Sequence, residues 1–329
     1  MCLVAFSRKP VYSALKKLRS SIRPAWAYLV ICDDCSHRCA WCYGGFNQDL
    51  HHGLSFADYQ AILAKLKEMG VVQLTLAGGE PTEHPDFRRF VAYANAQGFV
   101  IHVASHGEHI DHDLAGFLRD NGVDQVQINW QGRRNHDTVH GVAGSYDKAA
   151  AALGYLVAAG IETTVTITVG KYNLEHIDAI MQEAADLGVT RLRVWEATGL
   201  GNSFRKGLEA QAIFDRCRLA AHRLGYTHCL SYDPVYEGDV SVGCIQFANL
   251  YMYIDSRGKL RFCGAVPGAE EFADFLDPLQ DGAAIREKYL TRNAEILGQD
   301  APYCAARDGI TQVSTSPVTW DRRSLEKSI

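Results

Sequence analysis

The sequence predicts an α/β fold in which parallel strands alternate with helices, and three observations support this prediction. Six short runs rich in β-branched and apolar residues recur between residues 27 and 197. Most are followed by an amphipathic stretch that ends on glycine before the next run begins, which is typical of strand–helix units. Most of the runs are continuously apolar, as parallel strands covered on both faces should be. This alternation predicts a parallel sheet or barrel.

The order of the predicted elements fixes the size of that barrel. The strands are expected at 27–32, 71–77, 99–105, 125–130, 163–169 and 191–197. The helices are expected at 55–70, 84–98, 111–122, 145–160 and 173–188. Ser55 is the expected N-cap of the first helix, since a serine hydroxyl accepts from free N–H groups at a helix start. Six units are two short of a closed eight-stranded barrel, so we expect a partial (β/α)6 barrel.

The pattern changes after about residue 205. A helix-like stretch at 207–224 leads to residues 249–263, which alternate around Asp-Ser-Arg-Gly and predict a β-hairpin. We therefore expect a barrel domain over 25–205 and a small C-terminal α+β domain over 206–329 that ends in a polar tail.

Residues 1–24 form a separate basic segment with six Lys and Arg side chains and no acidic ones. Val11, Leu15, Leu18 and Ile22 fall on one face of a predicted helix. Such a helix can contact a membrane surface. We favour instead a helix that covers the bottom of the barrel and keeps its charges in water.

Composition excludes several classes of protein. The net charge of −5 gives no reason to expect a nucleic-acid partner. No apolar run is long enough to span a membrane and the N-terminus does not read as a secretory signal, so a cytoplasmic protein is expected. The chain has ten cysteines, and in that reducing compartment clustered cysteines indicate metal ligation rather than disulfides.

Four of these cysteines lie within residues 32–42, in the stretch CDDCSHRCAWC. Four thiolates could bind zinc or complete an iron–sulfur cluster. Cys35, Cys39 and Cys42 alone could hold three irons of a [4Fe–4S] cluster and leave the fourth iron open. Cys32 would then be a buried bystander, since a free cysteine packs as a small apolar residue.

This loop resembles the signature of the radical S-adenosylmethionine (SAM) superfamily, C-x3-C-x-aromatic-C, and Trp41 occupies the aromatic position. Gly78, Gly79 and Glu80 resemble the Gly-Gly-Glu element of that superfamily, which binds the amino group of the methionine moiety. The physical chemistry agrees, because glycines permit close backbone approach and a carboxylate satisfies an ammonium. Asn129, at the end of the fourth strand, resembles a position that contacts the ribose or carboxylate of SAM.

The resemblance covers roughly residues 26–200 and implies that this part of the chain is a TIM-like partial barrel with enzymatic activity. It implies a [4Fe–4S] cluster, reductive cleavage of SAM to a 5′-deoxyadenosyl radical, and hydrogen abstraction from a substrate carbon. A flavodoxin- or ferredoxin-type protein would be the electron donor.

A second set of cysteines flanks the predicted hairpin. Cys244, Cys263 and Cys304 resemble the ligands of SPASM or shorter twitch domains, which implies an auxiliary [4Fe–4S] cluster. A non-cysteine side chain, Cys217 or Cys229 could complete this set, or the fourth iron could be open. The alternative is that these cysteines are buried structural thiols.

The substrate is the least determined part of the prediction. A small metabolite such as a sugar, aminocyclitol or nucleotide is the main expectation, and maturation of a ribosomal peptide is the alternative. Glu196 is a candidate substrate contact, and Cys217 or Cys229 could donate a hydrogen atom in an epimerisation. A different class remains open, namely a non-catalytic regulatory protein that binds iron–sulfur or zinc.

Overall fold

A computed structural model describes residues 24–39, 41–42, 52–170, 172–196, 210–226, 230–233, 251–261 and 271–297. The predicted basic helix at the N-terminus lies outside these residues, as do Cys229, Cys244, Cys263 and Cys304.

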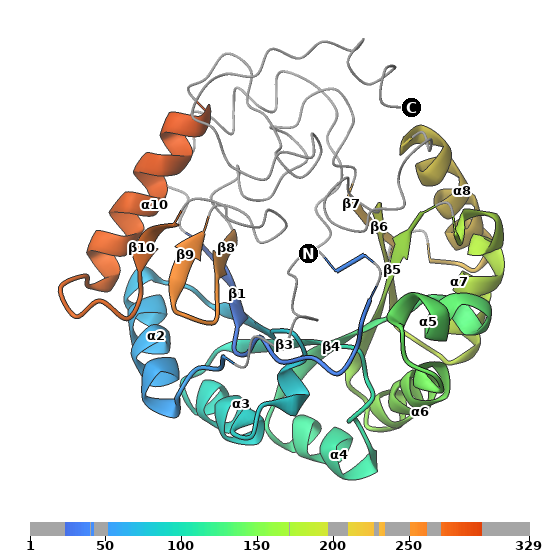
Figure 1. Cartoon of the computed structure of the whole chain (residues 1–329), viewed down its shortest axis with the longest axis horizontal. Helices are drawn as coiled ribbons and strands as arrows, with labels where there is room; N and C mark the ends of the chain where they lie inside the picture. The colour runs from blue at the N-terminus through green and yellow to red at the C-terminus, as the bar shows by residue number, and fades with distance from the viewer. Residues whose placement is uncertain are drawn as a thin grey trace.

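The described residues form one ten-stranded sheet with helices along its outside (Figure 1). The strand order is β10-β9-β8-β1-β2-β3-β4-β5-β6-β7. The strands span Trp26–Val30 (β1), Gln73–Ala77 (β2), Val100–Ser105 (β3), Val123–Asn129 (β4), Glu162–Val169 (β5), Arg191–Glu196 (β6), Leu230–Asp233 (β7), Tyr251–Ile254 (β8), Lys259–Arg261 (β9) and Glu271–Asp274 (β10).

The helices include those that the sequence predicted between residues 55 and 224 and two that it did not, at 132–140 and 282–297. They span Phe56–Met69 (α2), Phe87–Ala96 (α3), His112–Asp120 (α4), Gly132–His140 (α5), Ser145–Ala158 (α6), Ile177–Asp186 (α7), Ala210–Arg223 (α8) and Gly282–Leu297 (α10), with short 3-10 turns at Pro81–Glu83 (η2) and Leu174–His176 (η3). Ser55 caps α2 as expected, because its hydroxyl accepts from the backbone N–H of Asp58 at 3.1 Å.

The six predicted strands pair in parallel from β1 to β6, which confirms the partial α/β barrel. A seventh strand, β7, continues the parallel sheet beside β6 and was not predicted. The predicted hairpin is confirmed as the antiparallel pair β8 and β9. Strand β8 also pairs in parallel with β1, so the hairpin extends the barrel sheet.

Side chains along each strand alternate between two environments. Leu74, Val126 and their equivalents on other strands pack beneath the helices in the apolar core. Many of the side chains between them are polar or aromatic and lie on the opposite face, where Trp26 Nε1 donates to Thr75 Oγ1 at 2.7 Å. A closed eight-stranded barrel fills its interior with apolar side chains. The inner face here differs, because it carries polar side chains.

No helix within the described ranges is both long and apolar enough to cross a membrane.

Candidate functional site

The cluster loop, residues 35–42, leaves the barrel just after β1 and carries three partly exposed thiols. Burial raises the pKa of the Cys35 thiol to about 12, and the carboxylates of Glu80 and Glu83 and the thiol of Cys42 act in the same direction. Burial, followed by the charges of Cys35 and Cys42, raises the pKa of Cys39 well above its usual value.

Cys32 differs from these three cysteines, because its side chain is buried. Its side chain is 1% exposed. Its sulfur lies 3.3 Å from the backbone oxygen of Glu80, to which the thiol donates. The predicted burial of Cys32 is confirmed, and its exclusion from the ligand set stays a prediction.

The turn after β2 is bonded directly to the chain that leads into the cluster loop. Gly79 N donates to Cys32 O at 2.8 Å, and Glu80 N donates to Asp34 O at 2.7 Å. A Cβ atom at Gly78 would lie 2.7 Å from Cys32 O, and one at Gly79 would lie 2.1 Å from Asp34 O. Glycine is thus required here because two backbone segments touch, whereas the sequence suggested only that a ligand approaches.

The Glu80 carboxylate is 1% exposed and makes several hydrogen bonds. Oε1 accepts from Thr82 N at 3.1 Å and from the Ser105 hydroxyl at 2.7 Å. Oε2 accepts from His106 N at 2.8 Å. In this arrangement Glu80 fixes the end of β3 against the Gly-Gly-Glu turn. Its predicted contact with the amino group of SAM stays a prediction.

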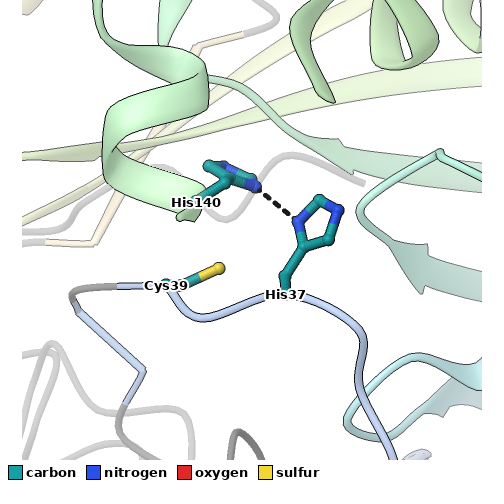
Figure 2. Close-up of side chains that lie close together, drawn as sticks. All are labelled: His37, Cys39 and His140. Carbon is teal, nitrogen blue, oxygen red and sulfur yellow. Dashed lines mark hydrogen bonds between the residues drawn. The ribbon is translucent and has the colours of Figure 1, made fainter. Parts of the chain in front are cut away.

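Four buried histidines form a continuous chain beside the cluster loop, and sequence reasoning missed it. The His106 and His37 rings stack with centroids 3.7 Å apart. His37 Nδ1 lies 3.0 Å from His140 Nδ1 (Figure 2), and the His140 and His136 rings stack at 4.1 Å. The spacing of four residues between His136 and His140 places both on one face of α5, which was the signal available in the sequence.

His37, within this chain, has an ionic partner. His37 Nε2 lies 2.8 Å from Glu108 Oε2, and Lys148 pairs with the other oxygen of Glu108. Burial alone would raise the pKa of Glu108, but the bonds from Lys148 and His37 outweigh it and lower that pKa. Burial also lowers the pKa of His140 well below its usual value, helped by the neighbouring histidines.

Trp41, Asn129 and Glu196 are three other predicted site residues that the structure describes. The Trp41 ring meets His140 edge-on with centroids 6.0 Å apart, and its buried Nε1 has no hydrogen-bond partner among the described residues. Asn129 ends β4 and accepts from Gln131 Nε2 at 3.2 Å. Glu196 is the last residue of β6.

Cys217 lies on α8 and is fully buried within the apolar core. Burial raises the pKa of its thiol to about 12. A hydrogen-atom donor has to reach a substrate radical, and packing beneath the helices does not offer that access. We therefore do not retain Cys217 as a candidate donor, and the prediction for Cys229 falls outside the described residues.

The donor chemistry of the loop fits an iron–sulfur cluster with one open iron. Three soft thiolate ligands come from one short loop, and the fourth nearby thiol is turned into the core. The loop lies at the carboxyl ends of parallel strands, where α/β barrels place their active sites. Fold and site together define an iron–sulfur protein built on a partial α/β barrel.

Comparison with known proteins points to the same kind of protein. The chain is similar to the Radical SAM superfamily, whose model matches residues 29–184, somewhat less than half of the chain. The Fe-coproporphyrin III synthase of Methanosarcina barkeri strain Fusaro is 27% identical over 160 residues, which are 48% of this chain and 40% of the relative. The PqqA peptide cyclase of Streptomyces rochei is 27% identical over 210 residues, which are 62% of this chain and 56% of the relative.

Solved structures agree on the fold. Streptococcus suis SuiB bound to its precursor peptide SuiA superposes with a TM-score of 0.65 and 16% identity, over 87% of this chain and 74% of that one. The chain spans about half the length of the curated relatives that it matches.

Proposed function

We propose that this protein is a radical SAM enzyme that modifies a peptide. The observation that carries the enzyme assignment is the three-thiol cluster loop bonded through its base to the Gly-Gly-Glu turn. When bound, the cluster and SAM supply a 5′-deoxyadenosyl radical that abstracts a hydrogen atom from a substrate carbon. The chain binds both groups, orients the substrate carbon and excludes water from the reaction.

The proposal gives each residue a role. Cys35, Cys39 and Cys42 would hold the cluster, and Trp41 occupies the aromatic position of the loop. Gly78, Gly79 and Glu80 would contact the methionine end of SAM, and Asn129, at the end of β4, would contact its ribose or carboxylate. Glu196 is the corresponding strand-end position on β6 and a candidate contact to the substrate.

A peptide substrate is favoured over the small metabolite that the sequence suggested. Four of the similar curated proteins are PqqA peptide cyclases. A tetrapyrrole is the second candidate, because the similar proteins also include an Fe-coproporphyrin III synthase and an AdoMet-dependent heme synthase. The polar and aromatic inner face of the sheet suits either a peptide or a large polar metabolite.

We also propose an auxiliary [4Fe–4S] cluster held by Cys244, Cys263 and Cys304. It would accept the electron left on a product radical in an oxidation or a cross-linking reaction. Anaerobic reconstitution should then yield about eight irons per chain. A yield of about four irons would contradict the auxiliary cluster but would still agree with a single radical SAM cluster.

Deuterium transfer tests the substrate class. Peptides encoded beside the gene, prepared with perdeuterated residues, and perdeuterated iron coproporphyrin III are each incubated with the reduced protein and SAM. Deuterium in 5′-deoxyadenosine from a peptide supports the proposal. Transfer from the porphyrin alone would overturn the peptide assignment.

A further inference from the structure

Three amide side chains form a hydrogen-bonded chain just beyond the carboxyl ends of β4 and β5. Asn173 Nδ2 donates to Gln131 Oε1 at 2.8 Å, and Gln131 Nε2 donates to Asn129 Oδ1 at 3.2 Å. Asn173 and Gln131 are both 0% exposed, whereas Asn129 is only partly buried. The amide chain therefore leads from the interior of the protein to the residue that is proposed to contact SAM.

Backbone groups fix the orientation of the innermost amide, that of Asn173. Its Oδ1 accepts from Gly170 N at 2.9 Å, and a backbone N–H can only donate. Its Nδ2 donates to Thr168 O at 3.0 Å, and a backbone carbonyl can only accept. Exchange of the amide oxygen and nitrogen would set a donor against a donor and an acceptor against an acceptor, so one orientation is strongly preferred.

This orientation passes along the chain of amides. Because Asn173 offers a donor to Gln131, the Gln131 atom that faces it is Oε1, and Nε2 at the other side of the amide is a donor. Gln131 therefore donates to Asn129, whose Oδ1 is the acceptor. The two N–H groups on Asn129 Nδ2 remain, and no residue in the described part of the chain accepts from them.

The Asn129 side chain lies on the inner face of the sheet. Its neighbours Ile128 and Trp130 both pack in the apolar core behind the sheet, and side chains alternate along a strand. Gln131 follows at the N-cap position of α5, where a side chain commonly bonds to free N–H groups, yet it makes no capping bond. Its amide is used instead to connect Asn173 to Asn129.

We propose that Gln131, anchored by Asn173, is a positioning residue that holds the Asn129 amide with its N–H groups toward SAM, so that Asn129 donates to the SAM carboxylate. A carboxylate is an acceptor-only group, and a hydrogen bond to a charged oxygen is stronger than one to a neutral hydroxyl. An amide that is already held in one orientation loses less conformational freedom when the ligand binds. This inference rests on the proposed SAM site and adds to it a residue that acts through Asn129.

Equilibrium dialysis of SAM against the full-length, anaerobically reconstituted protein tests the contact itself. The protein is left unreduced, so that SAM binds without being consumed. Asn129→Ala should weaken binding about tenfold, as expected for loss of a hydrogen bond to a charged group. Asn129→Asp has nearly the same shape and still accepts from Gln131, but it faces the ligand with a carboxylate, so it should weaken binding further. A ribose hydroxyl could donate to that carboxylate, so retained affinity in Asn129→Asp would overturn the contact with the SAM carboxylate.

The role of Gln131 is tested by Gln131→Met, which removes the amide at nearly constant size. It should weaken SAM binding about threefold, because Asn129 then has to be ordered by the ligand. In an Asn129→Ala background the same change should have no effect on SAM binding, since Gln131 acts only through that residue.

Gln125→Met is the matched control. Gln125 is a buried glutamine at the amino end of β4, and its Nε2 donates to Glu162. Both methionine variants lose a buried hydrogen bond and should lower the urea midpoint of the metal-free protein alike, but Gln125→Met should leave SAM affinity unchanged. Full affinity in Gln131→Met, an equal loss in Gln125→Met, or an undiminished effect of Gln131→Met beside Asn129→Ala would each overturn the proposal. A reconstituted wild type that binds no SAM would instead overturn the proposed function.

Discussion

Gly79 lies so close to the cluster loop that no larger residue fits without moving it. A methyl group there would come within 2.1 Å of Asp34 O, which is backbone and cannot rotate away. We expect Gly79→Ala to lower the free energy of unfolding by about 1–3 kcal/mol and to reduce iron bound after reconstitution. Chemical denaturation and iron analysis measure the two effects.

Gly154→Ala is the control for that change. Gly154 lies within α6, and no atom lies within 4 Å of a Cβ built there. Alanine should be neutral or stabilise the helix by about 1 kcal/mol, with full iron loading. Equal behaviour of the two variants would contradict the close packing of the turn on the loop.

Glu83 gives a pH dependence whose sign follows from its partners. Burial alone would raise the pKa of Glu83, but hydrogen bonds from His106 and Ser36 outweigh it and lower the pKa from 4.5 to about 2. The carboxylate therefore contributes stability above pH 4.5 that is lost as the pH falls toward about 2. Glu83→Gln should cost about 1–3 kcal/mol near neutral pH, and much less near pH 3.

Urea unfolding of the metal-free protein at the two pH values measures this difference. Asp86→Asn changes a half-exposed carboxylate on the same loop that caps no backbone group, and it should alter stability by less than about 0.5 kcal/mol. A cost for Glu83→Gln that is the same at both pH values would exclude the ionised carboxylate as its source.

At the scale of the elements, the C-terminal hairpin is tied to the barrel by α10. The Tyr289 hydroxyl donates to Tyr251 O at 2.5 Å, and Tyr289 is 1% exposed. Tyr289→Phe removes this bond and should cost about 1 kcal/mol. Because β8 pairs with β1, amide exchange should also rise in β1. Hydrogen-exchange mass spectrometry measures it, and Tyr155→Phe on the exposed side of α6 should leave it unchanged. Unaltered exchange in β1 would show that the hairpin does not support the barrel.

Local patterns predicted most elements, and the failures have physical causes. The first six strands are rich in apolar and β-branched residues, and most are followed by a helical stretch that ends on glycine, so their positions were readable. Strand β7 is only four residues long and reads LSYD, which offers no apolar run. The pairing of β8 with β1 joins residues far apart in the chain, and no local signal encodes it.

The site divides in the same way. Cysteine spacing on one loop predicted the cluster ligands, because those residues are neighbours in sequence. The histidine chain joins the cluster loop, the end of β3 and the end of α5, so its members become neighbours only when the sheet forms. The contact of Gly79 with Asp34 is likewise a consequence of pairing β1 with β2.

At the scale of the whole molecule, the carboxyl ends of β1 to β4 bring together every described residue of the proposed cluster and SAM site. The inner face of the sheet below them carries polar and aromatic side chains. The apolar core lies on the opposite face, between sheet and helices. Binding and stability are thus assigned to opposite faces of one sheet.

Formation of 5′-deoxyadenosine by the reconstituted, reduced protein tests the central claim most directly. The wild type and Cys32→Ala should both form it from SAM, and Cys39→Ala should lose both the cluster and the product. Cys32→Ala should also unfold more easily by about 1 kcal/mol, because it leaves a small cavity in the core. A colourless wild-type protein that binds zinc, or loss of the cluster in Cys32→Ala, would contradict the assignment of Cys35, Cys39 and Cys42 as the three ligands of a radical SAM cluster.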